Sequence, residues 1–280
     1  MIDLLYCGNE KVFDGVLTSL LSIFMRDERK DSYRVTIFTM DLTRLNEAYT
    51  PISDRLIAFL DKVAKRYNPE SSVRKVDVTD LYEEYLGHSP NEGCYCSPYT
   101  LLRLLIDKVD GFSDRLLYLD CDIMFNRDIH LLTDIDISGY EFAGANDHYG
   151  KYLIDTRYVN AGVLYFNLEE CRKTGLFEKA RGWINKKKLI FADQSAILRA
   201  SNHHYKLLGQ GFNDQKFLHS WTVVRHFSKR LFWLPYPHTD NIKQWHIEKV
   251  HKIFKYHAFD DIYDVYLQDK KEYESEDTCH

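Results

Sequence analysis

Two aspartates that follow an apolar run are the residues of this chain best suited to chemistry. Residues 116–119 show no polar alternation, which predicts a strand buried on both faces. Asp120 and Asp122 come directly after it, and side chains two positions apart on an extended chain point the same way. Two carboxylates about 4 Å apart repel by roughly 1 kcal/mol in water and about 4 kcal/mol near a protein surface. A hard divalent cation would offset this cost, whereas the simpler interpretation is an acidic turn at a strand exit.

The elements that must position this pair alternate between strand and helix patterns. This alternation predicts an α/β fold with a Rossmann-like, mostly parallel central sheet and helices on both faces. Ligands of such sheets collect outside the carboxyl ends of the strands, where Asp120 and Asp122 would stand. Hydrophobic periodicity predicts strands at 2–7, 35–39, 73–78, 116–119, 142–145 and 161–166, and helices at 12–24, 51–67, 97–109, 175–188 and 193–198.

Other polar residues stand at strand ends or helix starts, and each has two interpretations. Asn9 follows the first strand, where it would hold a base or ribose, or serve as a turn residue or helix cap. Arg103 is a lone cation among apolar residues, which pairs with Asp107 one turn on or lies near the carboxylates and a ligand. Asn160 stands just before a strand, and Asp193 begins a helix, where a plain N-cap is the alternative role.

Composition places the chain among ordinary globular proteins. It has 280 residues, of which 45% are hydrophobic and 28% charged, and its net charge of -5 argues against nucleic acid as a partner. No run approaches the roughly 20 apolar residues of a membrane span, and residues 1–7 read as a first strand and not as a signal peptide. The six cysteines are scattered without zinc-type spacing, and Cys94 and Cys96 are the only close pair. We therefore expect free thiols in a cytoplasmic protein.

Several segments, in order, resemble glycosyltransferase family 8, the retaining nucleotide-sugar transferases of the GT-A fold. The resemblance covers roughly residues 1–260. Tyr118-Leu119-Asp120-Cys121-Asp122 is similar to the family's Asp-x-Asp strand, and Asn160-Ala161-Gly162-Val163 to its Asn-Ala-Gly-Val segment. Asp193-Gln194 is similar to its Asp-Gln at a helix start, and His226, a little before Trp233, to its C-terminal metal histidine.

The resemblance implies a metal site. Asp120, Asp122 and His226 would bind Mn²⁺, with His257 as the second candidate for the histidine ligand. Two carboxylates and an imidazole favour Mn²⁺ over Mg²⁺, although Mg²⁺ remains an alternative, because a nitrogen ligand suits the softer ion.

The resemblance also implies contacts with the donor, a UDP-sugar. Asn9 would lie beside the uridine, and Arg103, Asn160 and Asp193 would contact the sugar. Gln194 would sit close to the anomeric carbon and stabilise an oxocarbenium-like centre through its amide oxygen. No carboxylate nucleophile stands out, Asp193 being the nearest candidate, so the resemblance favours a front-face route with retention of configuration.

Three parts of the chain follow from this interpretation. Residues 1–215 would form the nucleotide-sugar-binding GT-A catalytic domain, and residues 268–280 a charged tail that frays. Residues 216–267 would be a small basic and aromatic C-terminal extension that completes the site, with Lys229 or Arg230 on a closing loop reaching the phosphates. This extension would touch the inner face of a membrane weakly, or form a solvated face over packed aromatics, which is the interpretation we prefer.

The expected activity is metal-dependent transfer of a hexose, glucose or galactose, from a UDP-sugar to a hydroxyl group. The acceptor would be a carbohydrate or glycolipid, such as a glycan of the cell surface. Two alternatives stay open: a nucleotidyl- or phosphoryl-transfer enzyme that uses the same acidic pair, and a non-catalytic binding protein of the same fold. The sequence carries no signal for the oligomeric state.

Overall fold

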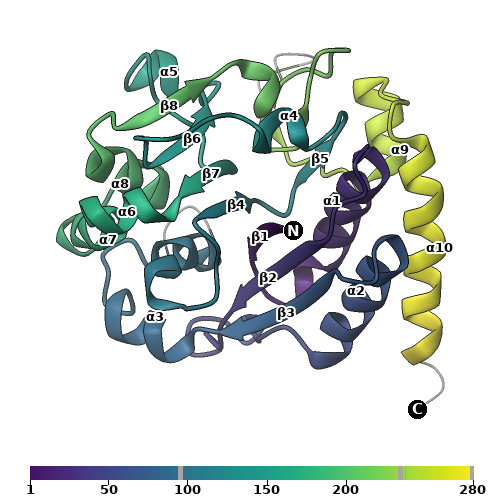
Figure 1. The fold of residues 1–280 in the computed structure, drawn as a ribbon, viewed down its shortest axis with the longest axis horizontal. Coiled ribbons are helices and arrows are strands. Elements are labelled where there is room, and N and C mark those ends of the chain that lie inside the picture. The colour runs from purple at the N-terminus through teal and green to yellow at the C-terminus, as the bar shows by residue number, and fades with distance from the viewer. Residues whose placement is uncertain (94–96, 233–235, 237, 278–280) are drawn as a thin grey trace.

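A seven-stranded sheet forms the centre of the molecule, and helices cover both of its faces (Figure 1). The computed structural model describes residues 1–93, 97–232, 236 and 238–277. Strand β7 runs antiparallel to both neighbours and the other pairs are parallel, so the predicted fold class is confirmed. In sheet order the strands are β3 (Ser72–Asp77), β2 (Tyr33–Thr39), β1 (Ile2–Cys7), β4 (Arg115–Leu119), β7 (Val163–Asn167), β6 (Phe142–Ala145) and β8 (Tyr205–Leu208).

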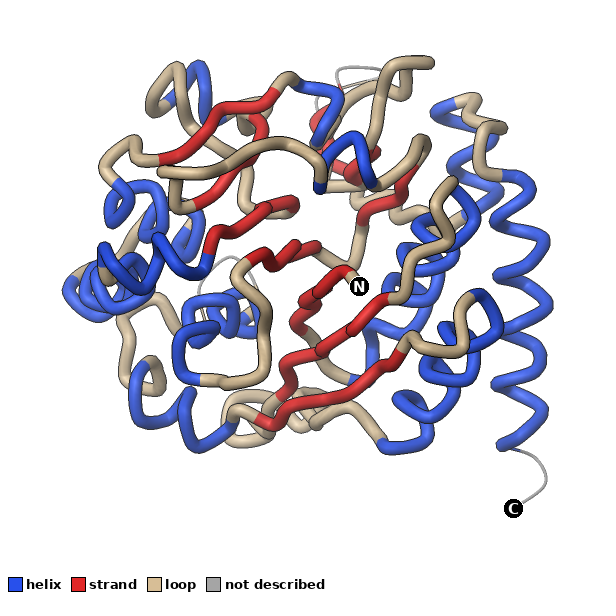
Figure 2. The backbone as a smooth tube through the Cα atoms, in the orientation of Figure 1, coloured by secondary structure: helices blue, strands red, loops and turns tan. Residues whose placement is uncertain are grey.

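Shorter strands and the helices surround this sheet (Figure 2). Two small antiparallel pairs join β5 (Ile123–Phe125) to β9 (Val224–His226) and β10 (Arg230–Phe232) to β11 (His238–Asp240). The helical segments are η1 (Glu10–Val12), α1 (Phe13–Arg26), α2 (Asp54–Tyr67), α3 (Thr79–Tyr85), η2 (Pro98–Lys108), α4 (His130–Thr133), α5 (Gly150–Leu153), α6 (Leu168–Thr174), α7 (Leu176–Lys186), α8 (Ala192–Ser201), η3 (Gln210–Phe212), α9 (Ile247–Lys249), η4 (Val250–Phe254) and α10 (Asp260–Asp277).

Each face of the sheet has its own hydrophobic core. Alternate residues of one strand enter opposite cores: Leu117 and Leu119 of β4 pack with α1, α2 and α10, whereas Leu116 and Tyr118 pack with η2, α7 and α8. Strand β4 is therefore buried on both faces, as its lack of polar alternation predicts.

The strand order places a topological switch point between β1 and β4. The chain proceeds from β1 to β2 and β3 on one side, and then crosses back to β4 on the other side. Asn9 follows β1 and Asp120 follows β4, so both stand at the carboxyl ends of the two strands that flank the switch. Open α/β sheets bind their ligands in the crevice at this place.

One helix starts later than predicted, and another starts at the predicted place but differs in type and in its cap. Helix α2 begins at Asp54, three positions after the predicted Pro51, because the Ser53 side chain accepts a hydrogen bond from the Leu56 amide and caps the helix there. The segment after Ser97 is a 3₁₀ helix, and its serine makes no side-chain capping hydrogen bond.

The expectation that residues 268–280 fray is wrong for the part that the structure describes. Helix α10 continues to Asp277 and lies along α1 and α2 (Figure 1). Tyr273 stacks on Phe13 with ring centroids 4.3 Å apart, and Lys62 pairs with Glu272 at 2.6 Å. Residues 278–280 lie outside the described residues. The many charges of residues 268–277 obscure the packing of Tyr273, which is why composition alone predicts a tail.

The thiols and the membrane-span prediction are tested in part. Cys7, Cys121 and Cys171 are free thiols, while Cys94 and Cys96 lie outside the described residues. Within the described ranges, every helix is either too short or too polar to cross a bilayer.

Candidate active site

Three predicted metal ligands meet at the carboxyl end of β4. Asp120 and Asp122 follow the strand, and His226 ends β9, which pairs with β5 so that Ile123 lies opposite the histidine. The His226 Nε2 atom lies 3.0 Å from Asp122 Oδ1 and 3.9 Å from Asp120 Oδ2. One ligand atom from each residue falls within 4.8 Å of the others, so the three side chains converge on one point.

The His226 ring is held in one orientation by its neighbours. Its Nδ1 atom lies 3.0 Å from Asn213 Oδ1, and because that oxygen can only accept, Nδ1 carries the proton. In the neutral ring, Nε2 therefore presents its lone pair to the carboxylates, as a metal ligand requires. Asn213 in turn donates to Asn160 Oδ1 at 2.9 Å, which ties the ring to the segment before β7.

Asp120 is fixed by one oxygen and presents the other. Its Oδ1 accepts from Arg103 Nη2 at 2.9 Å and from the Tyr118 hydroxyl at 2.7 Å. Arg103 is only 1% exposed and also pairs with Asp193, its Nε lying 3.2 Å from Oδ2. Arg103 does not bond to Asp107, which is paired with Arg181. The interpretation that places Arg103 near the carboxylates is therefore the right one.

Asp122 has a cationic neighbour, Lys243, that the sequence does not reveal. Lys243, which follows β11, directs its ammonium group at Asp122 Oδ2 and also donates to the Phe227 carbonyl at 3.2 Å. Burial raises the pKa of Asp122, but the charge of Lys243 and the contact with His226 outweigh it and hold that pKa well below the ordinary value. The protein itself thus supplies the positive charge that the acidic pair demands.

A second polar group lies beside the first, around the buried carboxylate of Asp147. Its Oδ2 accepts from Asn160 Nδ2 at 2.8 Å and from Gln194 Nε2 at 3.4 Å, and its Oδ1 accepts from the Gly150 amide at 2.6 Å. Gln194 Oε1 accepts from the Ala161 amide at 2.9 Å. The Gln194 amide is thus held at both ends, with its oxygen toward the chain segment that precedes β7.

Asp193 lies inside helix α8 and is not its cap. The N-cap residue is Phe191, and Asp193 turns its carboxylate to Arg103 instead. Burial raises the pKa of Asp193, and the Arg103 charge opposes this only in part. The residue is 5% exposed, so its carboxylate is a buried ion-pair partner within the same network.

Asn9 does cap a helix, which was one of its two interpretations. Its Oδ1 accepts from the Lys11 amide at 3.2 Å at the start of η1, and its Nδ2 donates to the Ala48 carbonyl at 3.1 Å. A contact with a base remains a prediction.

Of the two predicted phosphate cations, Arg230 makes its contacts outside this network. Arg230 donates to the Lys216 carbonyl at 3.1 Å and packs over the Phe217 and Phe254 rings, and Lys229 is exposed. Trp233, the end of the segment that we compared with the family, lies outside the described residues. His257 pairs with Asp260, so the fallback ligand belongs to another cluster.

Three residues of the site escape sequence reasoning, namely Asp147, Asn213 and Lys243. Asp147 follows β6 at its carboxyl end, a position that the sheet order marks but that looks like an ordinary loop in the sequence. Lys243 stands 121 positions from Asp122, and no local pattern joins the two.

A hollow of about 930 Å³ around Arg26 and Asn126 has none of the predicted site residues in its lining.

The strand order with its switch point and the polar network define an α/β protein of the GT-A class, and the comparisons with known proteins then give its family. Residues 3–230 match the model of glycosyl transferase family 8, so the chain belongs to that family. General stress protein A of Bacillus subtilis is 33% identical over 173 residues, which is 57% of this chain and 58% of that protein. A lipopolysaccharide 1,2-glucosyltransferase of Escherichia coli is 29% identical over 132 residues, 39% of this chain and 37% of that protein. The chain therefore spans less than two thirds of either relative.

Solved structures share the fold at low sequence identity. A galactosyltransferase, LgtC, in complex with donor and acceptor sugar analogs superposes with a TM-score of 0.69 at 17% identity, covering 95% of this chain and 96% of that one. The glycosyltransferase GlyE of Streptococcus pneumoniae gives a TM-score of 0.60 at 15% identity, covering 96% of this chain and 64% of that one. The GT-A architecture is thus shared over almost the whole chain.

Proposed function

We propose that this protein is a metal-dependent retaining hexosyltransferase that uses a UDP-sugar as donor. The observation that carries the proposal is the convergence of Asp120, Asp122 and His226 on one point at the carboxyl end of β4, beside the switch point of the sheet. Family membership supports sugar transfer as the activity, and the relatives include a lipopolysaccharide glucosyltransferase and a galactosyltransferase.

The residues present fit a divalent ion. Asp120 keeps Oδ2 free of its bonds to Arg103 and Tyr118, and Asn213 leaves the Nε2 lone pair of His226 aimed at the same point. This set of two carboxylates and one imidazole suits Mn²⁺, with Mg²⁺ as the alternative. When bound, the ion would act as a Lewis acid that stabilises the charge of the departing diphosphate.

Lys243 is our candidate for the cation that contacts the diphosphate, in place of Lys229 or Arg230. Its ammonium already lies against Asp122, and a divalent ion bound to this carboxylate would take over its role and release it. A released ammonium beside the site would donate to phosphate oxygens and stabilise the leaving group. We leave Lys229 and Arg230 as the competing assignment.

Gln194 and Asp147 would act at the sugar. We assign Gln194 to the anomeric centre, which its amide oxygen would stabilise as positive charge develops there. Asp147 serves as a positioning residue, because it accepts from Gln194 Nε2 and Asn160 Nδ2 and so fixes which way both amides face. Asn160 and Asp193 would contact the donor sugar, Asn9 the uridine, and a carbohydrate or glycolipid hydroxyl would be the acceptor.

A panel of UDP-sugars, UDP-glucose and UDP-galactose first, tests the proposal by binding and by hydrolysis with and without Mn²⁺. We expect Mn²⁺-dependent binding of at least one of them and slow release of UDP. Asp122→Asn should abolish turnover and leave the fold intact, because it removes a ligand charge and no packing. Turnover of nucleoside triphosphates without sugar transfer would identify the other enzyme class, and no Mn²⁺-dependent binding would refute the proposal.

A further inference from the structure

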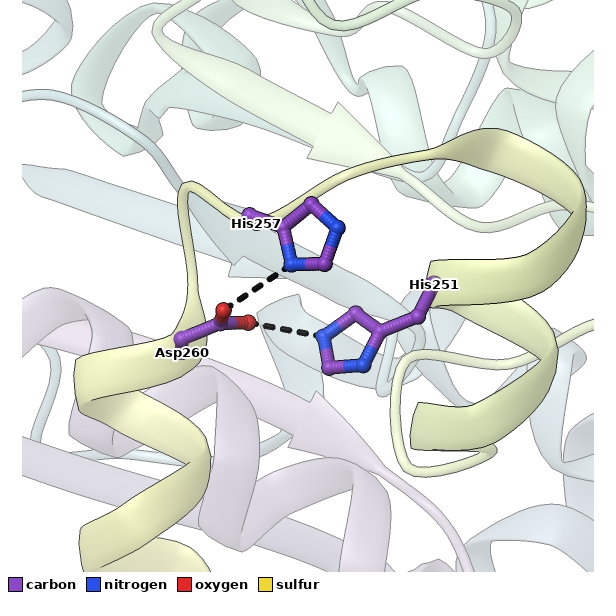
Figure 3. Close-up of side chains that lie close together, drawn as sticks. All are labelled: His251, His257 and Asp260. Atoms are coloured by element: carbon purple, nitrogen blue, oxygen red, sulfur yellow. Dashed lines mark hydrogen bonds and ion pairs between the residues drawn. The ribbon is translucent and has the colours of Figure 1, made fainter.

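Two histidines and an aspartate lie together where η4 leads into α10, outside the network described above (Figure 3). His251 Nε2 lies 2.7 Å from Asp260 Oδ1, and His257 Nδ1 lies 3.0 Å from Asp260 Oδ2. The three ligand atoms all fall within 4.8 Å of one another. We propose that this His–His–Asp cluster binds a divalent transition-metal ion, and that Zn²⁺ is the ion its ligands fit best.

The arrangement of the rings is what a shared ion would need. The imidazoles of His251 and His257 stack with centroids 4.5 Å apart and planes 22° from parallel, and both direct a nitrogen at the same carboxylate. Two protonated rings in this stack would repel each other. Neutral rings coordinate through His251 Nε2 and His257 Nδ1 while the other nitrogen of each keeps its proton. When the ion binds, the ring nitrogen that faces Asp260 loses its proton to solvent, and the other nitrogen of the same ring takes one up. Each imidazole therefore stays neutral, and the ion replaces the two hydrogen bonds to Asp260.

The ligand set distinguishes this cluster from the acidic pair. Two imidazole nitrogens and one carboxylate match the His and Asp ligands of zinc, whereas Mn²⁺ and Mg²⁺ prefer oxygen. The side chains of His251, His257 and Asp260 are 32%, 64% and 47% exposed, so water can complete a tetrahedral shell. We therefore expect the His–His–Asp cluster to prefer Zn²⁺ and the acidic pair with His226 to prefer Mn²⁺.

The position of the cluster gives the ion a structural role. Asp260 begins α10, and the next residue, Asp261, is bound to Arg26 of α1, so this end of the helix is anchored. His251 lies on the segment that follows Lys243 and Gln244, and Gln244 Nε2 donates to the Cys121 carbonyl at 2.9 Å. An ion that binds both His251 and Asp260 would hold the segment that carries Lys243 against the anchored end of α10.

Metal titration of the full, untagged chain tests the proposal, with Asp122→Asn as the background so that the acidic site no longer competes. Zn²⁺ is followed by competition with a chromophoric chelator, and Co²⁺ by its visible absorption. We expect one equivalent of Zn²⁺ to bind to the Asp122→Asn protein. His257→Ala in the same background should weaken that binding by at least about tenfold, because it removes a direct ligand. The exposed His88 provides the control, since His88→Ala should bind as the background does.

Two results would overturn the proposal. One is equal Zn²⁺ affinity of the His257→Ala and His88→Ala proteins, which means that the ion sits elsewhere. The other is loss of Zn²⁺ binding in the Asp122→Asn background itself, which assigns the ion to the acidic pair. His257→Gln must show the same loss as His257→Ala, with metal-free melting unchanged, which rules out misfolding as the cause. The test does not depend on sugar transfer, so its failure would leave the proposed function standing.

Discussion

Gly162 lies directly against the imidazole ring of His226. A Cβ atom added to this glycine would come within 2.4 Å of His226 Cε1 and 2.8 Å of His226 Nδ1, which is closer than side-chain atoms approach one another. The glycine of the Asn160-Ala161-Gly162-Val163 segment is therefore required by space and not by backbone conformation. It lets the ring reach the acidic pair while Nδ1 keeps its bond to Asn213.

Gly162→Ala should weaken Mn²⁺ binding by about 10- to 100-fold, because the ring must shift away from Asp120 and Asp122. Mn²⁺ affinity measured by electron paramagnetic resonance checks this. Gly182→Ala is the matched control: Gly182 lies in α7 with no atom near its added Cβ, so the variant should keep its Mn²⁺ affinity and gain up to about 1 kcal/mol of stability. Equal Mn²⁺ affinity in both variants would show that the ring position does not matter.

Arg103→Met should lower the free energy of unfolding by about 3–5 kcal/mol, because it leaves Asp193 buried and without its cation and deprives Asp120 of a donor. Urea denaturation at neutral pH measures the loss. Arg103→Met with Asp193→Asn should recover part of it, since the double variant buries one charge fewer. A single variant as stable as the wild type would mean that the ion pairs contribute nothing net.

The sequence predicts the strands that build the sheet but not the contacts that cross it. The apolar composition of residues 116–119 predicts a buried strand, and β4 confirms this prediction. Asp120 and Asp122 are found because their signal is local, two carboxylates at a strand exit. Lys243 and Asn213 carry no local signal: each becomes part of the site only when β9 pairs with β5 and the segment after β11 folds over the acidic pair.

The same limit explains the error at the chain's end, whereas the error at the start of α2 has a local cause. Residues 268–277 look like a solvated tail because most of them are charged. Their one aromatic residue, Tyr273, stacks on Phe13 of α1, and only the partner helix shows which face is buried. Pro51 is a favourable first residue for a helix, but Ser53, two positions later, is the residue whose side chain caps α2. A tertiary partner decides the first case, whereas a cap within the local sequence decides the second.

Acid should destabilise the protein through Asp3, a buried carboxylate. Burial raises the pKa of Asp3, but its bonds to Arg34 and to the Ser113 amide outweigh this and hold that pKa below its ordinary value of 3.8. The folded state then binds fewer protons than the unfolded state, so the stabilisation is complete above the unfolded pKa and is lost as the pH falls through the folded pKa. Urea unfolding can be measured between pH 6 and pH 3, a range that spans the ordinary carboxylate pKa of about 3.9. The free energy of unfolding should fall below roughly pH 4.

Asp3→Asn should remove this acid dependence and cost about 1–3 kcal/mol at pH 7, because the Arg34 fork loses its charged acceptor. Asp110→Asn changes an exposed carboxylate instead, and its unfolding curve should keep the wild-type slope in acid. If Asp3→Asn loses stability in acid as steeply as the wild type, then other carboxylates dominate the acid transition.

Lys243→Met should change the binding of metal and nucleotide in opposite directions. The ammonium competes with any cation for Asp122, so its removal should strengthen Mn²⁺ binding in the absence of nucleotide. The same ammonium, once released, would donate to the diphosphate, so UDP should bind the Mn²⁺-loaded variant about tenfold more weakly or worse. Calorimetric titration with Mn²⁺ alone, and then with UDP at saturating Mn²⁺, separates the two effects.

Lys229→Met and Arg230→Met should leave both affinities near the wild-type values. A loss of UDP affinity in those variants and not in Lys243→Met would assign the phosphate contact to Lys229 or Arg230. Parallel loss of both affinities in Lys243→Met would make Lys243 a structural member of the acidic site.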